Sequence, residues 1–315
     1  MTAGTGTGIR RGGGHSRTAD ALPHFVAHLV RAAVAAPSMH NCQPWRFRYR
    51  PAGRAIELHA DPGRALGCGD PEGRSVHIGC GAALFNLRLA ATWMGREPVV
   101  RLLPSPDNPL LLATVRLGGA HRPTTGEREL YAAIPRRHTG RQPFANRAVP
   151  GTVLAELAEA ARTEGAVLHL LHPCETQRVL RLAADSERAV LTDPRYRAEL
   201  GEGAAGEREP RVAVLSTQFR ARADWLRAGQ ALQRVLLLAT VRGVSAQPLS
   251  QPLEVPDAWL VRDPRSGIEQ PQMILRLGYG PSVPPAPRRP VSEVVDAPQE
   301  GSEPAGRPRH LRNRR

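Results

Sequence analysis

Two segments of this chain match each other closely enough to constrain the whole fold. Aligning "GAALFNLRLAATWMG" (81–95) with "GQALQRVLLLATVRG" (229–243), an offset of 229 − 81 = 148 residues, gives seven identical residues in fifteen. Both segments have an apolar helical pattern, and both end at a glycine placed as a helix C-cap. Composition alone can produce such a match between helices rich in alanine and leucine, which is the alternative. The matched end glycines favour two degenerate copies of one half-domain.

Around these two helices the same order of elements is expected twice: helix, strand, buried helix, strand. The first copy has helical spacing over about 21–36 and alternation at 45–50, and further strands are predicted at "AIELHAD" and "LLLATVRL". The second copy has a helix over about 152–163 and strands at "GAVLHLLH", "RVAVLST" and "QMILRLGYG". We therefore predict an α+β fold in which each half has a mixed sheet with surrounding helices.

Composition marks the two ends of the chain, and the boundary between the halves is placed at Tyr131, where the pattern of elements begins again. Residues 1–18 and 297–315 are rich in glycine, proline and arginine, which predicts disordered tails. The first half is expected over 19–130 and the second over 131–296.

Each copy carries a polar motif that the other lacks. The motif "PSMHNCQPW" (37–45) follows the first helix of the first copy, and "RRHTGR" (136–141) precedes the first helix of the second copy. A turn built by Pro37, Asn41 and Pro44 can present main-chain groups edge-on to a planar ligand, and Trp45 is expected to anchor the loop in the core. An ordinary helix-to-strand connection is the alternative. We expect the two motifs to be different parts of one site.

The motif "RRHTGR" has the chemistry of a phosphate site. Guanidinium groups offer fixed forks of donors for phosphate oxygens, and Thr139 adds a hydroxyl. A solvated basic loop is the alternative. Arg288 and Arg289, with prolines on both sides, suit a second phosphate clamp, although they could also be a tail charge cluster.

All 43 basic residues of the chain are arginine, so a lysine Schiff base or a P-loop lysine is excluded. The formal net charge of +14 would suit nucleic acid, but much of it lies in the tails, and aromatic residues make up only 4% of the chain. Anionic small molecules are favoured over nucleic acid.

The four cysteines form no C-x-x-C pair, so we expect neither a disulfide framework nor a structural zinc site. His77 and Cys80 could share a helix face, but no second ligand pair accompanies them, and we expect no metal. Neither a signal peptide nor a run of about 18 apolar residues is apparent, so a soluble cytoplasmic protein is expected.

These motifs resemble a known family of flavin enzymes. "AAVAAPSMHNCQPWRF" is similar to the A-P-S-x-x-N-x-Q-P-W signature of the nitroreductase family, and "RRHTGR" to its R-x-[ST]-x-[KR] signature. "APRRPVSEVV" resembles the family's C-terminal basic element, and the two long helices resemble its Acg-like actinobacterial branch. Family members are usually homodimers with FMN at each of two interface sites. The resemblance implies a fused pseudo-dimer that retains one flavin site, either a monomer or a homodimer.

The resemblance also implies which residues bind FMN. It carries over Pro37, Ser38, Met39 and Asn41 from the first half, and Arg137, His138, Thr139 and Arg141 from the second, with Arg288 and Arg289 at the phosphate and Ser250 and Gln251 beside the flavin ring. Many members have Glu-Gly where this chain has Ser250 and Gln251, and Arg141 replaces a more usual lysine. No protein side chain is expected to be catalytic, because the flavin carries the chemistry.

The implied function is an FMN-dependent oxidoreductase. NADH or NADPH would reduce the flavin, and a nitro compound, a quinone or a similar small molecule would accept the electrons. The first alternative is a flavin-binding or sequestering protein without turnover, with 195–210 as a candidate cover over the site. A weaker alternative is nucleic-acid binding through the arginine-rich tails.

Overall fold

The computed structural model describes residues 22–65, 70, 72–140, 142–190, 211–249 and 269–296. The chain up to residue 136 contains α2 (His24–Val34), β1 (Trp45–Arg50), β2 (Ala55–Ala60), α3 (Arg74–Trp93), β3 (Arg96–Leu102), β4 (Leu111–Ala120) and α4 (Thr125–Ala133), with 3₁₀ turns at Met39–Asn41, Pro51–Gly53, Pro62–Arg64 and Ile134–Arg136; α4 spans the predicted boundary between the halves. The second half contains α5 (Gly151–Thr163), β5 (Val167–Leu170), α6 (Pro173–Val190), β6 (Arg211–Thr217), α8 (Arg222–Val241), β7 (Ser245–Leu249), β8 (Gln270–Gly278) and α9 (Val291–Val294).

The two halves build their sheets in the same way. The strand order is β1-β2-β4-β3 in the first sheet and β5-β6-β8-β7 in the second, so corresponding strands occupy corresponding places. The pairings between these strands are antiparallel, and a parallel bridge between Phe47 and Val295 lies at the edge of the first sheet. The predicted α+β class and two-repeat arrangement are confirmed, but the predicted mixed sheet is wrong, because the described strands of both sheets pair antiparallel.

Sequence patterns located most elements but missed β3, α4, β7 and the short helix α9. The helices α2, α3, α5 and α8 and the strand β6 lie where apolar periodicity predicts them. The strand β3 was not predicted, because "REPVVRL" lies at the sheet edge and its exposed positions hide the alternation. The helix α4 was not predicted either, although Thr124 and Glu127 form a capping box at its start.

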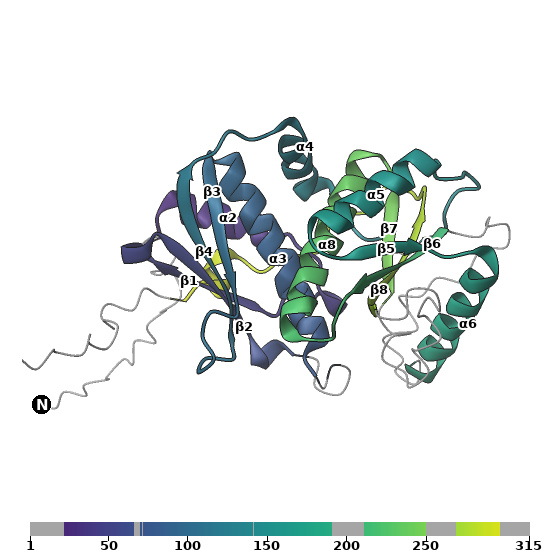
Figure 1. The fold of residues 1–315 in the computed structure, drawn as a ribbon, viewed down its shortest axis with the longest axis horizontal. Helices are drawn as coiled ribbons and strands as arrows, with labels where there is room; N and C mark the ends of the chain where they lie inside the picture. Colours follow the sequence, from purple (N-terminus) through teal and green to yellow (C-terminus); the bar gives the residue numbers. More distant parts are fainter. Residues whose placement is uncertain are drawn as a thin grey trace, which may run out of the picture.

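The helices α3 and α8 lie side by side between the two sheets and make the most extensive contact among the described helices and strands (Figure 1). Gly81 and Gly229, the residues paired by the sequence alignment, meet at their crossing: a Cβ added at Gly81 would lie 3.0 Å from the Gly229 Cα. Each helix also supplies the other half's core, Ile78 to the second and Leu226 to the first. The halves therefore have separate cores, and each core includes a side chain from the other half's long helix.

The C-terminal segment crosses from the second half to the first. After β8 the chain reaches α9 beside β1, where the Asp296 backbone N–H donates to the Phe47 carbonyl at 2.9 Å. Val294 and Val295 are buried in the core of the first half. Among the described residues, no helix is both long and apolar enough to span a bilayer.

The close contact between α3 and α8 predicts that a methyl group added at Gly229 destabilises the protein. In Gly229→Ala the added Cβ would lie 2.9 Å from the Ala82 backbone nitrogen and would overlap the Ile78 carbonyl, so the two helices must separate. We expect a loss of about 3 kcal/mol or more in the free energy of unfolding, measured by denaturant titration. Gly126→Ala in α4, where the new Cβ meets nothing within 4 Å, should be neutral or stabilising. Equal stability of the two variants would contradict this view of the interface.

Candidate functional site

The loop after α2 has a strained backbone. Pro37 and Ser38 lead into a 3₁₀ turn at Met39–Asn41, and His40, Asn41 and Gln43 have φ values of 47°, 55° and 51°. They are three of the five non-glycine residues with positive φ in the described part of the chain. Left-handed backbone at consecutive non-glycine residues persists only where the surroundings enforce it, and it is concentrated at binding sites.

Hydrogen bonds inside this loop hold that conformation. The Gln43 backbone N–H donates to the Ser38 hydroxyl at 2.9 Å, and the Gln43 side chain donates to the Asn41 carbonyl at 3.3 Å. Trp45 is fully buried and anchors the loop in the core, as the motif predicts. Because the Ser38 hydroxyl oxygen already accepts a bond within the loop, this side chain shapes the loop.

The second motif reaches the first through Arg137. The helix α4 and the turn Ile134–Arg136 bring it back toward α2, and its backbone N–H donates to Ala133 at 2.9 Å. The Arg137 guanidinium donates to the Thr139 hydroxyl and to the Ala35 carbonyl, both at 3.2 Å. Its side chain lies in the interior, since the residue is only 4% exposed. Ala35 is the C-cap of α2, so the two motifs meet at a helix terminus.

Arg288, from the C-terminal segment, contacts the same Ala35 carbonyl. Its guanidinium donates to the Asn41 side-chain oxygen at 3.0 Å and to the Ala35 carbonyl at 3.4 Å. The Asn41 amide donates in return to the Pro287 carbonyl at 2.9 Å. Three segments far apart in sequence, represented by Asn41, Arg137 and Arg288, therefore form one cluster.

This cluster has an excess of positive charge. Among the described residues no carboxylate pairs with Arg137 or Arg288, and the Nε of each is buried without a hydrogen-bond partner. Burial, with a smaller contribution from the charge of Arg288, lowers the pKa of Arg137 to about 10, and burial also lowers the pKa of Arg288. The C-terminus of α2 offers only about half a negative charge against two full positive charges. An anion with several acceptor oxygens would complete the cluster.

Arg289, unlike Arg288, has carboxylates close to its guanidinium group. It lies 3.6 Å from Asp61 and 3.5 Å from Glu293, and its backbone N–H donates to the Gln43 side chain at 2.8 Å. The two adjacent arginines, predicted together as a phosphate clamp, thus have different surroundings: the charge of Arg289 is balanced, and that of Arg288 is not.

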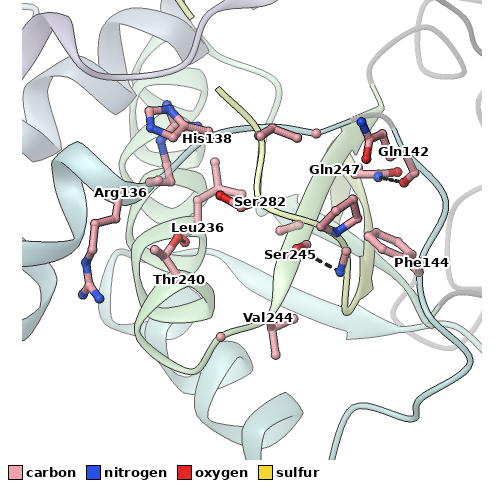
Figure 2. Close-up of a pocket in the computed structure, with 17 residues that line it drawn as sticks. Arg136, His138, Gln142, Phe144, Leu236, Thr240, Val244, Ser245, Gln247 and Ser282 are labelled. Carbon is pink, nitrogen blue, oxygen red and sulfur yellow. Dashed lines mark hydrogen bonds between the residues drawn. The ribbon is translucent and has the colours of Figure 1, made fainter. Parts of the chain in front are cut away.

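A pocket of about 250 Å³ lies behind the second motif (Figure 2). The segment lines it with Arg136, Arg137, His138, Gly140, Gln142 and Phe144, together with the end of α8, the start of β7 and residues 280–283. Burial, and then the charges of Arg137 and Arg288, lower the pKa of His138. Both His138 and Arg137 line this pocket, and the Arg137 guanidinium also reaches the Ala35 carbonyl, so the pocket borders the cluster.

Only some of the remaining predicted site residues lie in the described part of the chain. Pro37 and Met39 belong to the strained loop, whereas Arg141, Ser250 and Gln251 lie outside the described residues. Two groups of this cluster were not predicted from the sequence. The Ala35 carbonyl accepts from Arg137, and no side-chain motif can reveal a main-chain acceptor. Gln43 accepts from the Arg289 backbone N–H, and its position inside the motif 37–45 could have pointed to it.

Two side chains considered as metal ligands have other partners. His77 contacts the Gly73 carbonyl at 2.6 Å and accepts from Arg222 at 2.9 Å, and the Cys80 thiol donates to Pro44 at 3.3 Å. No group of three metal-binding side chains occurs in the described part of the chain.

Comparisons with known proteins agree with this architecture. No family model matches the chain. Two Mycobacterium tuberculosis proteins are similar to it: "Putative NAD(P)H nitroreductase Rv3131", 32% identical over 87% of this chain and 92% of the relative, and "Putative NAD(P)H nitroreductase acg", 30% identical over 85% and 94%. The crystal structure of a "putative nitroreductase" from Anabaena variabilis matches 81% of this chain and 87% of its own, with a TM-score of 0.59 at 10% identity, which shows a shared fold. The chain belongs to the nitroreductase family.

Proposed function

We propose that this chain binds one FMN and uses it to transfer electrons from NADH or NADPH to a small-molecule acceptor such as a nitro compound or a quinone. The observation that carries this proposal is the pair of desolvated guanidinium groups at the end of α2. Arg137 and Arg288 share the Ala35 carbonyl and have no carboxylate partner among the described residues. A phosphate monoester carries the charge and the acceptor oxygens that this pair needs.

The strained loop suits the other end of the same ligand. A backbone fixed at residues 37–43 can present main-chain groups to the edge of a planar ring without an ordering cost on binding. FMN would supply the hydride acceptance and the electron transfer. The protein binds the phosphate at Arg137 and Arg288, orients the ring at this loop and requires no side-chain acid or base.

Residues outside the described part complete the proposal through the family resemblance alone. Arg141 would place a permanent positive charge near the pyrimidine end of the ring and stabilise the anionic reduced flavin. Ser250 and Gln251 would lie beside the ring in place of Glu-Gly. A single site formed by both halves is compatible with a monomer, and a homodimer is the alternative.

A flavin-binding protein without turnover remains the second candidate. The same cation pair supports flavin binding in both cases, so the candidates differ only in access to the ring. The predicted cover over 195–210 lies outside the described residues, as do the tails that the weaker nucleic-acid hypothesis requires.

Anaerobic reduction separates an oxidoreductase from a protein that only sequesters flavin. We expect the absorbance of the bound flavin to bleach when NADH or NADPH is added, and to recover on addition of a quinone or a nitroaromatic compound. A protein that binds FMN but bleaches with neither donor is not an NAD(P)H oxidoreductase. Dithionite serves as the positive control, because it shows that the bound flavin can be reduced.

The phosphate half of the site can be tested without flavin. Inorganic phosphate should raise the melting temperature of the apoprotein by about 2 to 4 °C near saturation, measured against sodium chloride at equal ionic strength. Arg288→Ala should abolish this rise without lowering the melting temperature in chloride, because it removes a partly buried cation that repels Arg137. Arg242→Ala is the matched control, since Arg242 pairs with Glu156 on the surface. An unchanged phosphate response in Arg288→Ala would rule out this assignment.

A further inference from the structure

The segment 287–296, here called the C-terminal strap, carries Arg288 from the second half to the first. Its far end is a strand-like contact with β1: Phe47 bridges Val295, and the Asp296 backbone N–H donates to the Phe47 carbonyl at 2.9 Å. Val294 is fully buried and Val295 is 4% exposed, so this end is part of the first core. The position of Arg288 therefore depends on how the strap is held.

Asp296 is the strongest polar anchor at the far end. Its carboxylate accepts from Arg46 Nε at 2.8 Å and lies 2.7 Å from Arg46 Nη2, and it also accepts from Arg48 Nη2 at 3.2 Å. Arg46 and Arg48 alternate with buried residues along β1 and therefore project from the same face of the sheet. The side chains of Asp296 and Arg48 are 22% and 24% exposed, which limits the screening of this ion pair by water, whereas Arg46 is 41% exposed and its pair is screened more.

Two side chains of the strained loop hold the near end. Asn41 bonds the strap through both ends of its amide, donating to the Pro287 carbonyl and accepting from Arg288. Gln43 accepts from the Arg289 backbone N–H, and Asp61 and Glu293 lie close to the Arg289 guanidinium. The Arg288 backbone is thus fixed between contacts at residues 287 and 289.

Such anchoring has a physical reason. The Arg288 guanidinium is partly buried and close enough to Arg137 for its charge to lower the pKa of that residue. Without an anion, desolvation and repulsion both favour moving this side chain into water. The anchors offset that tendency by keeping the strap against the first half.

We propose that Asp296 is a positioning residue for cofactor binding: by fixing the far end of the strap, it sets the affinity of Arg288 for the cofactor phosphate. This inference rests on the proposed function. Asp296 touches neither Arg137 nor Arg288 in the structure, so its effect must pass through the strap. The coupling is reciprocal, so a bound phosphate should also hold the strap in place.

The test compares FMN with riboflavin, which has the same ring but no phosphate. In Asp296→Ala, we expect FMN to bind about tenfold more weakly while riboflavin affinity is unchanged, as measured by quenching of flavin fluorescence. Asp296→Glu should recover most of the FMN affinity. Glu57→Ala is the matched control, because Glu57 pairs with Arg50 on the same sheet without touching the strap.

A second readout follows the strap directly. Trypsin should cleave the Arg288–Arg289 bond faster in Asp296→Ala than in Glu57→Ala, and FMN should slow that cleavage in the unaltered protein, as measured by mass spectrometry.

Equal FMN affinity in Asp296→Ala and the unaltered protein would overturn the inference. An equal loss for FMN and riboflavin would also overturn it, since a general structural defect would then be the cause. An unaltered protein that binds no FMN would instead refute the proposed function.

Discussion

The site depends on one crowded interaction: two guanidinium groups donate to the carbonyl at the end of α2. Arg137 comes from the second half, Ala35 from the first, and Arg288 from the strap that joins them. Two desolvated cations in contact with one carbonyl are unfavourable without an anion, so the fold must hold them there. The strained loop, the turn before Arg137 and the anchored strap each contribute to that restraint.

The restraint in turn depends on how the two halves meet. Gly81 and Gly229 allow α3 and α8 to approach closely, and they are equivalent positions in the two copies. Equivalent residues that touch each other lie on a two-fold axis in a symmetric dimer. Their contact in one chain supports descent from a dimer with two equivalent sites. The polar motifs no longer obey that symmetry, which supports a single surviving site.

The sequence predicted features formed by neighbouring residues better than contacts between residues far apart in the chain. The strained loop and its anchor Trp45 were predictable, because their pattern is local. The meeting of Asn41 with Arg288 was predictable only through the family resemblance, since 288 − 41 = 247 residues separate them. The contrast between Arg288 and Arg289 could not be predicted, because it depends on the distant Asp61 and on which side of the strap each residue faces.

We propose that both halves together form one phosphate-binding flavin site. Titration of the purified apoprotein with FMN in a calorimeter counts the sites. We expect one FMN per chain, and loss of that binding when Arg137 is changed to alanine. Two FMN per chain, or one that survives Arg137→Ala unchanged, would contradict it.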